Sequence, residues 1–341
     1  MGAVTRFPKI DLHIHLAGTG CCNSGCSVSD EFRKRFTFRA LQLLQGISKQ
    51  QLNHTIDGDW ASRVAAMVAG SELDYGVVLG MDAVYEQGLG IPDAARSQLV
   101  VPPEWVFQVC RAHRGLLPGP SVNPHSRDAL DRLAYCIDQG AVLIKWLPIS
   151  QAIDPGSPRL KPFYRLLADH RIPLLVHMGG ERTFKAIAPE YNNVGLLEPA
   201  LDEGVKVIIA HAGTRILPSR EPDQSKRIKD MLRHWDRLWV DNSGLLNPSR
   251  FVHAPAMARD EELTQKMLYG SDWPVPSSSV YFTAMLGWRK VLALESNRNP
   301  LARDVMTKRL LGFPDATLTR ANLVLANLHR WMGPSSLGCD Q

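Results

Sequence analysis

Short apolar runs rich in β-branched residues recur along the chain, and each is followed by a segment with helical periodicity. These runs predict strands at residues 10–15, 75–81, 116–122, 142–147, 172–178, 205–210, 238–241 and 267–271. Helix candidates between them include residues 126–138, 163–170, 196–203, 225–234 and 279–294. Alternating strands and helices predict a parallel sheet, and eight repeats predict a closed (β/α)8 TIM barrel.

The chain is longer than eight such units need, so we expect one domain over residues 1–341 with additions to the barrel. Residues 16–57 exceed what the first strand-to-helix connection needs, and they contain apolar side chains that could pack as a short helix. We expect a lid over the barrel mouth, because long loops in compact domains are usually functional or disordered. Residues 82–103 form a second long loop on the same face, and residues 295–341 predict a helical tail.

In the first predicted strand, Ile10, Leu12 and Ile14 alternate with three polar residues, Asp11, His13 and His15. Side chains alternate between the two faces of a strand. We therefore expect the apolar set to pack against the helices and the polar set to point into the barrel.

Composition narrows the class of protein. The 341 residues include 39 Lys and Arg against 34 Asp and Glu, a net charge of +5, with 45% hydrophobic residues. This is typical of a soluble globular protein. The mild charge indicates no nucleic-acid or membrane partner, and no apolar stretch predicts a membrane span or a signal peptide. The six cysteines form no disulfide framework; Cys21, Cys22 and Cys26 share one loop, which favours reduced thiols and a cytoplasmic location.

Polar residues stand at the carboxyl ends of several predicted strands. His177 and His211 end two of them, and Asp272 follows the last. Because the carboxyl ends of all barrel strands open on one face, we expect these residues to meet His13 and His15 there. Imidazole and carboxylate are ligands that Zn²⁺ prefers, with Mn and Fe as alternatives. The sequence therefore predicts a divalent-metal site holding one or two ions.

Lys145 ends the fourth predicted strand and should also lie inside the barrel. As an ammonium it would repel a metal, and it would then pair with Asp11 or Asp272 or extend to the rim. As a carbamate formed with CO₂ it would bridge two metals. Both interpretations remain open from the residues alone.

As a set, these residues resemble the amidohydrolase superfamily, in its amidohydrolase-related branch that also contains non-oxidative decarboxylases. The resemblance rests on Asp11-x-His13-x-His15, on His177 and His211, and on Tyr269-Gly270-Ser271-Asp272-Trp273-Pro274, and it covers nearly the whole chain. It implies a TIM barrel in which His13, His15 and Asp272 hold the more buried metal and Asp272 moves the proton of the attacking water. His177 and His211 then either hold a second metal with carbamylated Lys145, or His177 joins a single-metal site while His211 polarises the substrate.

Loops just past the strand ends supply candidates for substrate contact. Arg182 and Arg215 would suit a carboxylate, Trp146 and Trp273 a flat ring, and Glu181 lies beside Arg182.

Three functions remain as hypotheses. The first is a hydrolase that opens a C–N or C–O bond (amide, lactone or ester) in a small, carboxylate-bearing molecule. The second keeps the fold and metal but is a lyase, a non-oxidative decarboxylase or a hydratase. The third is a barrel that binds a ligand without catalysis. The sequence does not specify the oligomeric state, and a homo-oligomer is compatible with it.

Overall fold

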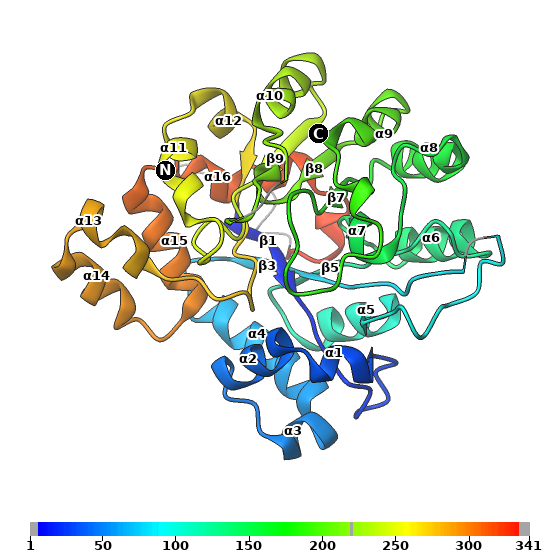
Figure 1. Cartoon of the computed structure of the whole chain (residues 1–341), viewed down its shortest axis with the longest axis horizontal. Coiled ribbons are helices and arrows are strands. Elements are labelled where there is room, and N and C mark those ends of the chain that lie inside the picture. Colours follow the sequence, from blue (N-terminus) through cyan, green and yellow to red (C-terminus); the bar gives the residue numbers. More distant parts are fainter. Residues whose placement is uncertain (1–5, 87, 219–220, 334–341) are drawn as a thin grey trace.

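The computed structural model describes residues 6–86, 88–218 and 221–333. Each of the eight predicted runs contains an observed strand: β1 (Ile10–His15), β3 (Tyr75–Leu79), β5 (Leu116–Gly119), β6 (Ile144–Trp146), β7 (Leu174–Val176), β8 (Val207–Ile209), β9 (Leu238–Asp241) and β10 (Met267–Leu268). They gather at the centre of the molecule, and helices surround them (Figure 1). The predicted alternation of strand and helix is thereby confirmed.

The eight strands form two parallel sheets, ordered β1-β3-β5 and β10-β9-β8-β7-β6. Backbone hydrogen bonds connect the ends of the two sheets. At one junction the Val142 amide donates to the Pro118 carbonyl at 2.9 Å, and at the other the His15 amide donates to the Trp273 carbonyl at 2.8 Å. The arrangement is that of a TIM barrel, as predicted.

Amphipathic helices cover the outside of the strands, as βαβ crossovers require. The longer ones are α4 (Ile56–Ala69), α5 (Pro103–Ala112), α6 (Ala129–Asp138), α8 (Lys161–Asp169), α10 (Ser225–His234) and α15 (Pro300–Leu311); the shorter ones include α7 (Pro148–Gln151), α9 (Glu198–Asp202), α11 (Ala254–Ala258) and α12 (Glu261–Gln265). The helix predicted over 279–294 is interrupted. It divides into a 3-10 turn, α13 (Thr283–Leu286) and α14 (Trp288–Glu295), because Gly287 adopts a φ of 82° between them.

The predicted alternation in β1 is wrong for its first half. Ile10 and Leu12 pack with Val77, Leu79 and other strand residues in the barrel core. Ile14 instead packs with helix residues, as expected. The pairing of β1 with β3 shifts register between Asp11 and Ile14. Such an irregularity changes which face a side chain meets, and the sequence pattern alone does not reveal it.

Asp11 therefore does not point towards the two histidines. Its Oδ1 accepts hydrogen bonds of 3.0 Å from the backbone amides of His13 and Ser271. Burial raises the pKa of Asp11 to about 7, although its hydrogen bonds and nearby Lys308 oppose the shift. Asp11 therefore connects β1 to the segment that follows β10.

Residues 16–57 fold into α1 (Asp30–Lys34), α2 (Phe36–Leu44) and α3 (Lys49–His54) before α4 begins. Strand β2 (Ser27–Val28) pairs antiparallel with β4 (Leu99–Val100), so this insertion is joined to the second long loop. We call residues 16–57 the lid segment; its helices lie at one side of the barrel (Figure 1).

The last part of the predicted helical tail, after α15, closes the opposite end of the barrel. The whole tail contains α15, α16 (Ala316–Thr319) and α17 (Ala321–Val324), while residues 334–341 lie outside the described part. Ala321, Val324 and Leu328 pack in the same core cluster as Ile10 and Leu12. Among the helices of the described residues, none is long and apolar enough to cross a lipid bilayer.

Candidate functional site

The five predicted metal ligands meet at the carboxyl ends of the strands. Asp272 Oδ1 lies 3.2 Å from His15 Nε2 and 3.5 Å from His13 Nε2. His177 Nδ1 lies 3.2 Å from His211 Nε2, and the rings of His13 and His211 stack with centroids 5.1 Å apart. The structure thus brings together side chains from β1, from the ends of β7 and β8, and from the loop after β10.

Two of these residues adopt a backbone conformation that is rare outside glycine. His211 has a φ of 55° and Asp272 a φ of 67°. Such conformations cost of order 1 kcal/mol or more and gather at functional sites. Gly270 also belongs to this geometry, because a Cβ there would lie 2.7 Å from the Cβ of His13. The turns after β8 and β10 are therefore shaped to aim these side chains at the barrel axis.

Lys145 lies inside the barrel and is fully buried. Within the described residues, the hydrogen bond recorded for its amine joins Nζ to His13 Nε2 at 3.1 Å rather than to Asp11 or Asp272. Burial lowers the pKa of Lys145 to about 8, although Asp241, Asp272 and Glu181 oppose the shift. This shift increases the neutral fraction of the amine near pH 7, and only a neutral amine can take up CO₂.

Asp241, at the end of β9, is a site residue that the sequence pattern did not single out. Its Oδ2 accepts a 2.8 Å hydrogen bond from His13 Nδ1, and its Oδ1 accepts one of 2.7 Å from the His211 backbone amide. Ser243 Oγ donates to the same carboxylate and lies 2.8 Å from His211 Nδ1. The sequence did contain an indication of this role, because Asp241 stands at the carboxyl end of its strand, as His177 and His211 do in theirs.

The buried histidines are in the form that binds metals. Burial lowers the pKa of His13, His177 and His211 well below the ordinary value, and nearby Lys145 or Arg250 lowers it further. They are therefore neutral at pH 7. Since His13 Nδ1 donates to Asp241 and His211 Nδ1 donates to the Ser243 carbonyl, each ring keeps Nε2 for a ligand bond.

These residues fit a divalent metal. Ligand atoms of His13, His211 and Asp272 all lie within 4.8 Å of one another. His177 Nε2 is buried without a hydrogen-bond partner, which is costly unless another group satisfies it. Neutral imidazoles around a carboxylate form a donor set for Zn²⁺ and its neighbours in the first transition row.

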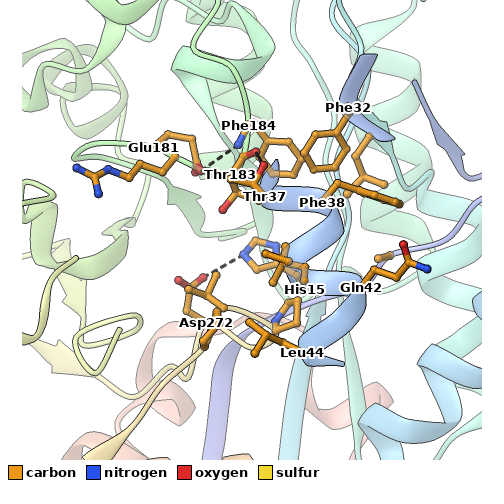
Figure 2. Close-up of a pocket in the computed structure, with 18 of the residues that line it drawn as sticks. His15, Phe32, Thr37, Phe38, Gln42, Leu44, Glu181, Thr183, Phe184 and Asp272 are labelled. Atoms are coloured by element: carbon orange, nitrogen blue, oxygen red, sulfur yellow. Dashed lines mark hydrogen bonds and ion pairs between the residues drawn. The ribbon is translucent and has the colours of Figure 1, made fainter. Parts of the chain in front are cut away.

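A cavity of about 390 Å³ lies above these residues. His15, His177, His211 and Asp272 contribute to its floor, and the lid segment supplies much of its wall. Phe32, Phe38 and Phe184 gather above His15 and Asp272 (Figure 2). The lid segment therefore borders the cavity above the histidines.

Two predicted substrate contacts line this cavity. Arg182 does so, but its guanidinium also donates to the Pro218 carbonyl at 2.8 Å. Glu181 lines it as well; burial raises the pKa of this carboxyl, and Oε2 lies 3.6 Å from His177 Nε2. Arg215 is not among the lining residues, which corrects its assignment; the next residue, Ile216, lines the cavity instead.

Neither predicted tryptophan lines the cavity. Trp146 is fully buried, donates to the Val122 carbonyl at 2.7 Å and packs against Phe163. Trp273 packs behind Trp60, with ring centroids 4.6 Å apart. Both predictions are corrected, because these side chains face the surrounding helices rather than the barrel mouth.

Asp57 holds the base of the lid segment. It is fully buried, and its carboxylate accepts hydrogen bonds from the amides of Thr19 at 2.6 Å and Gly20 at 3.0 Å, and from the Ser24 hydroxyl. Cys21 Sγ donates to the same group at 3.3 Å. The described cysteines are free, and the Cys21 loop serves here as part of the lid's attachment.

A TIM barrel with buried imidazoles and a carboxylate at its strand ends has the donor set of a barrel site that fits a metal ion. The amidohydrolase family model matches residues 10–311. The chain therefore belongs to the amidohydrolase family, as the sequence resemblance predicted.

Solved structures agree on the fold. An uncharacterized TIM-barrel protein from Bordetella bronchiseptica is 18% identical, with a TM-score of 0.56 over 92% of this chain and 99% of that one. A candidate 2-pyrone-4,6-dicarboxylic acid hydrolase from Pseudomonas putida is 14% identical, with a TM-score of 0.52 over 95% and 97%. Identities this low show the fold alone. None of the curated proteins matches the chain at the sequence level.

Proposed function

We propose that this protein is a metal-dependent hydrolase that directs water to a C–N or C–O bond of a small molecule. The proposal rests above all on one observation: neutral, buried histidines and Asp272 converge beneath a cavity large enough for a small-molecule substrate. Membership of the amidohydrolase family supports it.

His13, His15 and Asp272 would hold the more buried ion, with Zn²⁺ favoured over Mn or Fe by the imidazole-rich donor set. His177 and His211 would either hold a second ion with carbamylated Lys145 or divide between metal and substrate. A divalent ion lowers the pKa of bound water towards ~7 and polarises a carbonyl.

The chain's own residues supply positioning and proton transfer. The Asp272 carboxylate reaches the cavity floor and can take a proton from the attacking water and pass it to the leaving group. His211, whose Nδ1 donates to the Ser243 carbonyl, has an unprotonated Nε2; this atom can bind an ion as it stands, and it would polarise a substrate carbonyl only after taking up a proton. Arg250 binds the carbonyls of Thr214 and Gly180 and so joins the loops after β7 and β8 around the site.

The test is turnover in H₂¹⁸O of a panel of esters, lactones, amides and aryl carboxylic acids by the metal-loaded protein. Hydrolysis places ¹⁸O in the product carboxylate, which is the expected result. Release of CO₂ with no ¹⁸O in the organic product would instead assign the decarboxylase alternative. Addition of labelled water to a double bond would assign a hydratase. Ligand binding without any turnover would instead indicate a barrel that binds a ligand without catalysis.

A further inference from the structure

Two polar side chains of α2 in the cavity wall already have partners within the protein. Thr37 Oγ1 donates to the Thr183 carbonyl at 3.1 Å, and Gln42 Nε2 donates to the Ile47 carbonyl at 3.0 Å. Both residues belong to α2 and line the cavity (Figure 2). Their hydrogen bonds stabilise the lid segment and leave these groups poorly suited to recognise a polar substrate.

The charged side chains in the wall also form hydrogen bonds within the protein. Arg182 and Arg250 donate to backbone carbonyls, and Glu181 accepts hydrogen bonds from the amides of Thr183 and Phe184. The two lining cations are matched by two lining carboxylates, Glu181 and Asp272, so a surplus of positive charge would come from metal at the floor and not from the wall around the rest of the substrate.

The rest of the wall is apolar. Phe32 packs against Phe38 and Phe184, with ring centroids 5.4 and 5.0 Å apart. The other apolar lining residues of the lid segment and adjacent loops include Leu41, Leu44, Ile47, Leu52, Leu99, Ile216 and Val275. On the floor, by contrast, His177 Nε2 is buried without a hydrogen-bond partner.

Helix α2 gives a second, independent indication. None of its nine residues is buried, although most are apolar. Phe36 and Leu44, which line the cavity, remain 84% and 63% exposed. Apolar surface that borders a substrate cavity and stays in water gains stability when an apolar ligand covers it.

We infer that the substrate is a neutral ester, lactone or amide whose reacting carbonyl lies at the histidine floor and whose remainder is a bulky apolar group. That group packs between α2 and the cluster of Phe32, Phe38 and Phe184. This inference rests on the proposed function for the identity of the reacting group. It replaces the expectation of a carboxylate-bearing substrate.

The test uses p-nitrophenyl esters of acetic, butyric, hexanoic and octanoic acids, with the glutaric half-ester as a charged counterpart. We expect kcat/KM to rise about threefold to fourfold per methylene, the change that corresponds to about 0.8 kcal/mol of buried CH₂. The glutaryl ester should be turned over at least tenfold less efficiently than the hexanoyl ester. Equal turnover across the series, or preference for the glutaryl ester, would overturn the inference.

Hydroxamic acids with the same chains separate this inference from the proposed function, because their binding needs no turnover. Calorimetry should show Kd falling with chain length on the metal-loaded protein. If Kd falls in this way but no ester, lactone or amide is hydrolysed, the proposed function fails while the apolar site stands. If hydrolysis occurs without any length dependence in either series, only the inference fails.

Matched variants locate the apolar contact on α2. Leu41→Ala shortens a residue that lines the cavity, and we expect its loss in kcat/KM to be about fivefold for the octanoyl ester and smallest for the acetyl ester. Leu43→Ala is the control, because Leu43 is 81% exposed on the same helix and does not line the cavity. Leu44→Ala replaces Leu41→Ala if that variant does not fold. Equal effects of lining and control variants would contradict the placement.

Discussion

Asp241 Oδ2 accepts a hydrogen bond of 2.8 Å from His13 Nδ1, and both side chains are completely buried. The other oxygen of this carboxylate binds the His211 backbone amide, so one residue on β9 orients histidines from β1 and from the end of β8. A buried carboxylate behind a ligand histidine fixes its tautomer and raises its basicity.

Asp241→Asn should therefore weaken metal binding by about 10- to 100-fold, because an amide orients His13 Nδ1 less strongly than a carboxylate does. Competition with a chromogenic zinc chelator measures the change. The control is Asp236→Asn, an exposed position before the same strand, which should bind zinc as the parent protein does. Unchanged zinc affinity in Asp241→Asn would remove this residue from the site.

Asp272→Asn should lower kcat by about 10²- to 10⁴-fold, because an amide cannot take a proton from water at neutral pH. Thermal unfolding should show that the fold is retained. Metal content, measured on the same sample, separates loss of proton transfer from loss of the ion. Retained turnover would exclude Asp272 as the base.

Removal of metal by a chelator should abolish activity and lower the unfolding temperature, because a ligand that binds only the folded state stabilises it. Activity should return with Zn²⁺, and metal analysis then gives one or two ions per chain. Lys145→Met decides the role of Lys145. If a carbamate bridges two ions, this variant holds one ion fewer than the parent; if Lys145 is an amine, the number of ions stays the same.

Asp57→Ala should loosen the lid segment, since it leaves the buried amides of Thr19 and Gly20 without their acceptor. We expect KM to rise and the unfolding free energy to fall by about 1–3 kcal/mol. Limited proteolysis should cut within residues 16–57 faster than in the parent. Ser62→Ala, at an exposed position on the same helix, is the control and should leave the cleavage rate unchanged.

Glu72 predicts a pH dependence of stability. Its hydrogen bonds to Arg309 and Lys9 lower its pKa from 4.5 to about 2. The folded state therefore favours the charged carboxylate, and the stabilisation is present above pH 4.5 and is lost as the pH falls through 2. Because the pair is partly exposed, Glu72→Gln should cost only about 1 kcal/mol at pH 7. Urea unfolding should show this difference shrinking between pH 4.5 and 3; a constant difference would contradict it.

Several features could be predicted because they depend on local pattern. The apolar runs located all eight strands, since burial on both faces of a parallel strand produces a continuous apolar stretch. Polar residues at the ends of these runs pointed to His177, His211 and Asp272, because barrel topology gathers strand ends on one face. Lys145 was placed inside the barrel for the same reason, and the structure agrees.

Other features depended on contacts between distant segments. The register shift in β1 turned Asp11 away from the histidines, and Trp146 and Trp273 packed against helices that no strand pattern specifies. Asp241 belongs to the site because folding places β9 beside β8 and brings Asp241 within hydrogen-bond distance of His13. The two residues are 228 positions apart in the sequence.

The sequence by itself determined the barrel, its order of strands and helices, and the residues at the strand ends, because hydrophobic periodicity and strand length are local properties. The tertiary structure alone decided which of those residues touch, how His13 and His211 are oriented, and that the cavity wall is largely apolar. The physical reason is that hydrogen-bond satisfaction and cavity chemistry arise from side chains far apart in the chain, and their proximity exists only after folding.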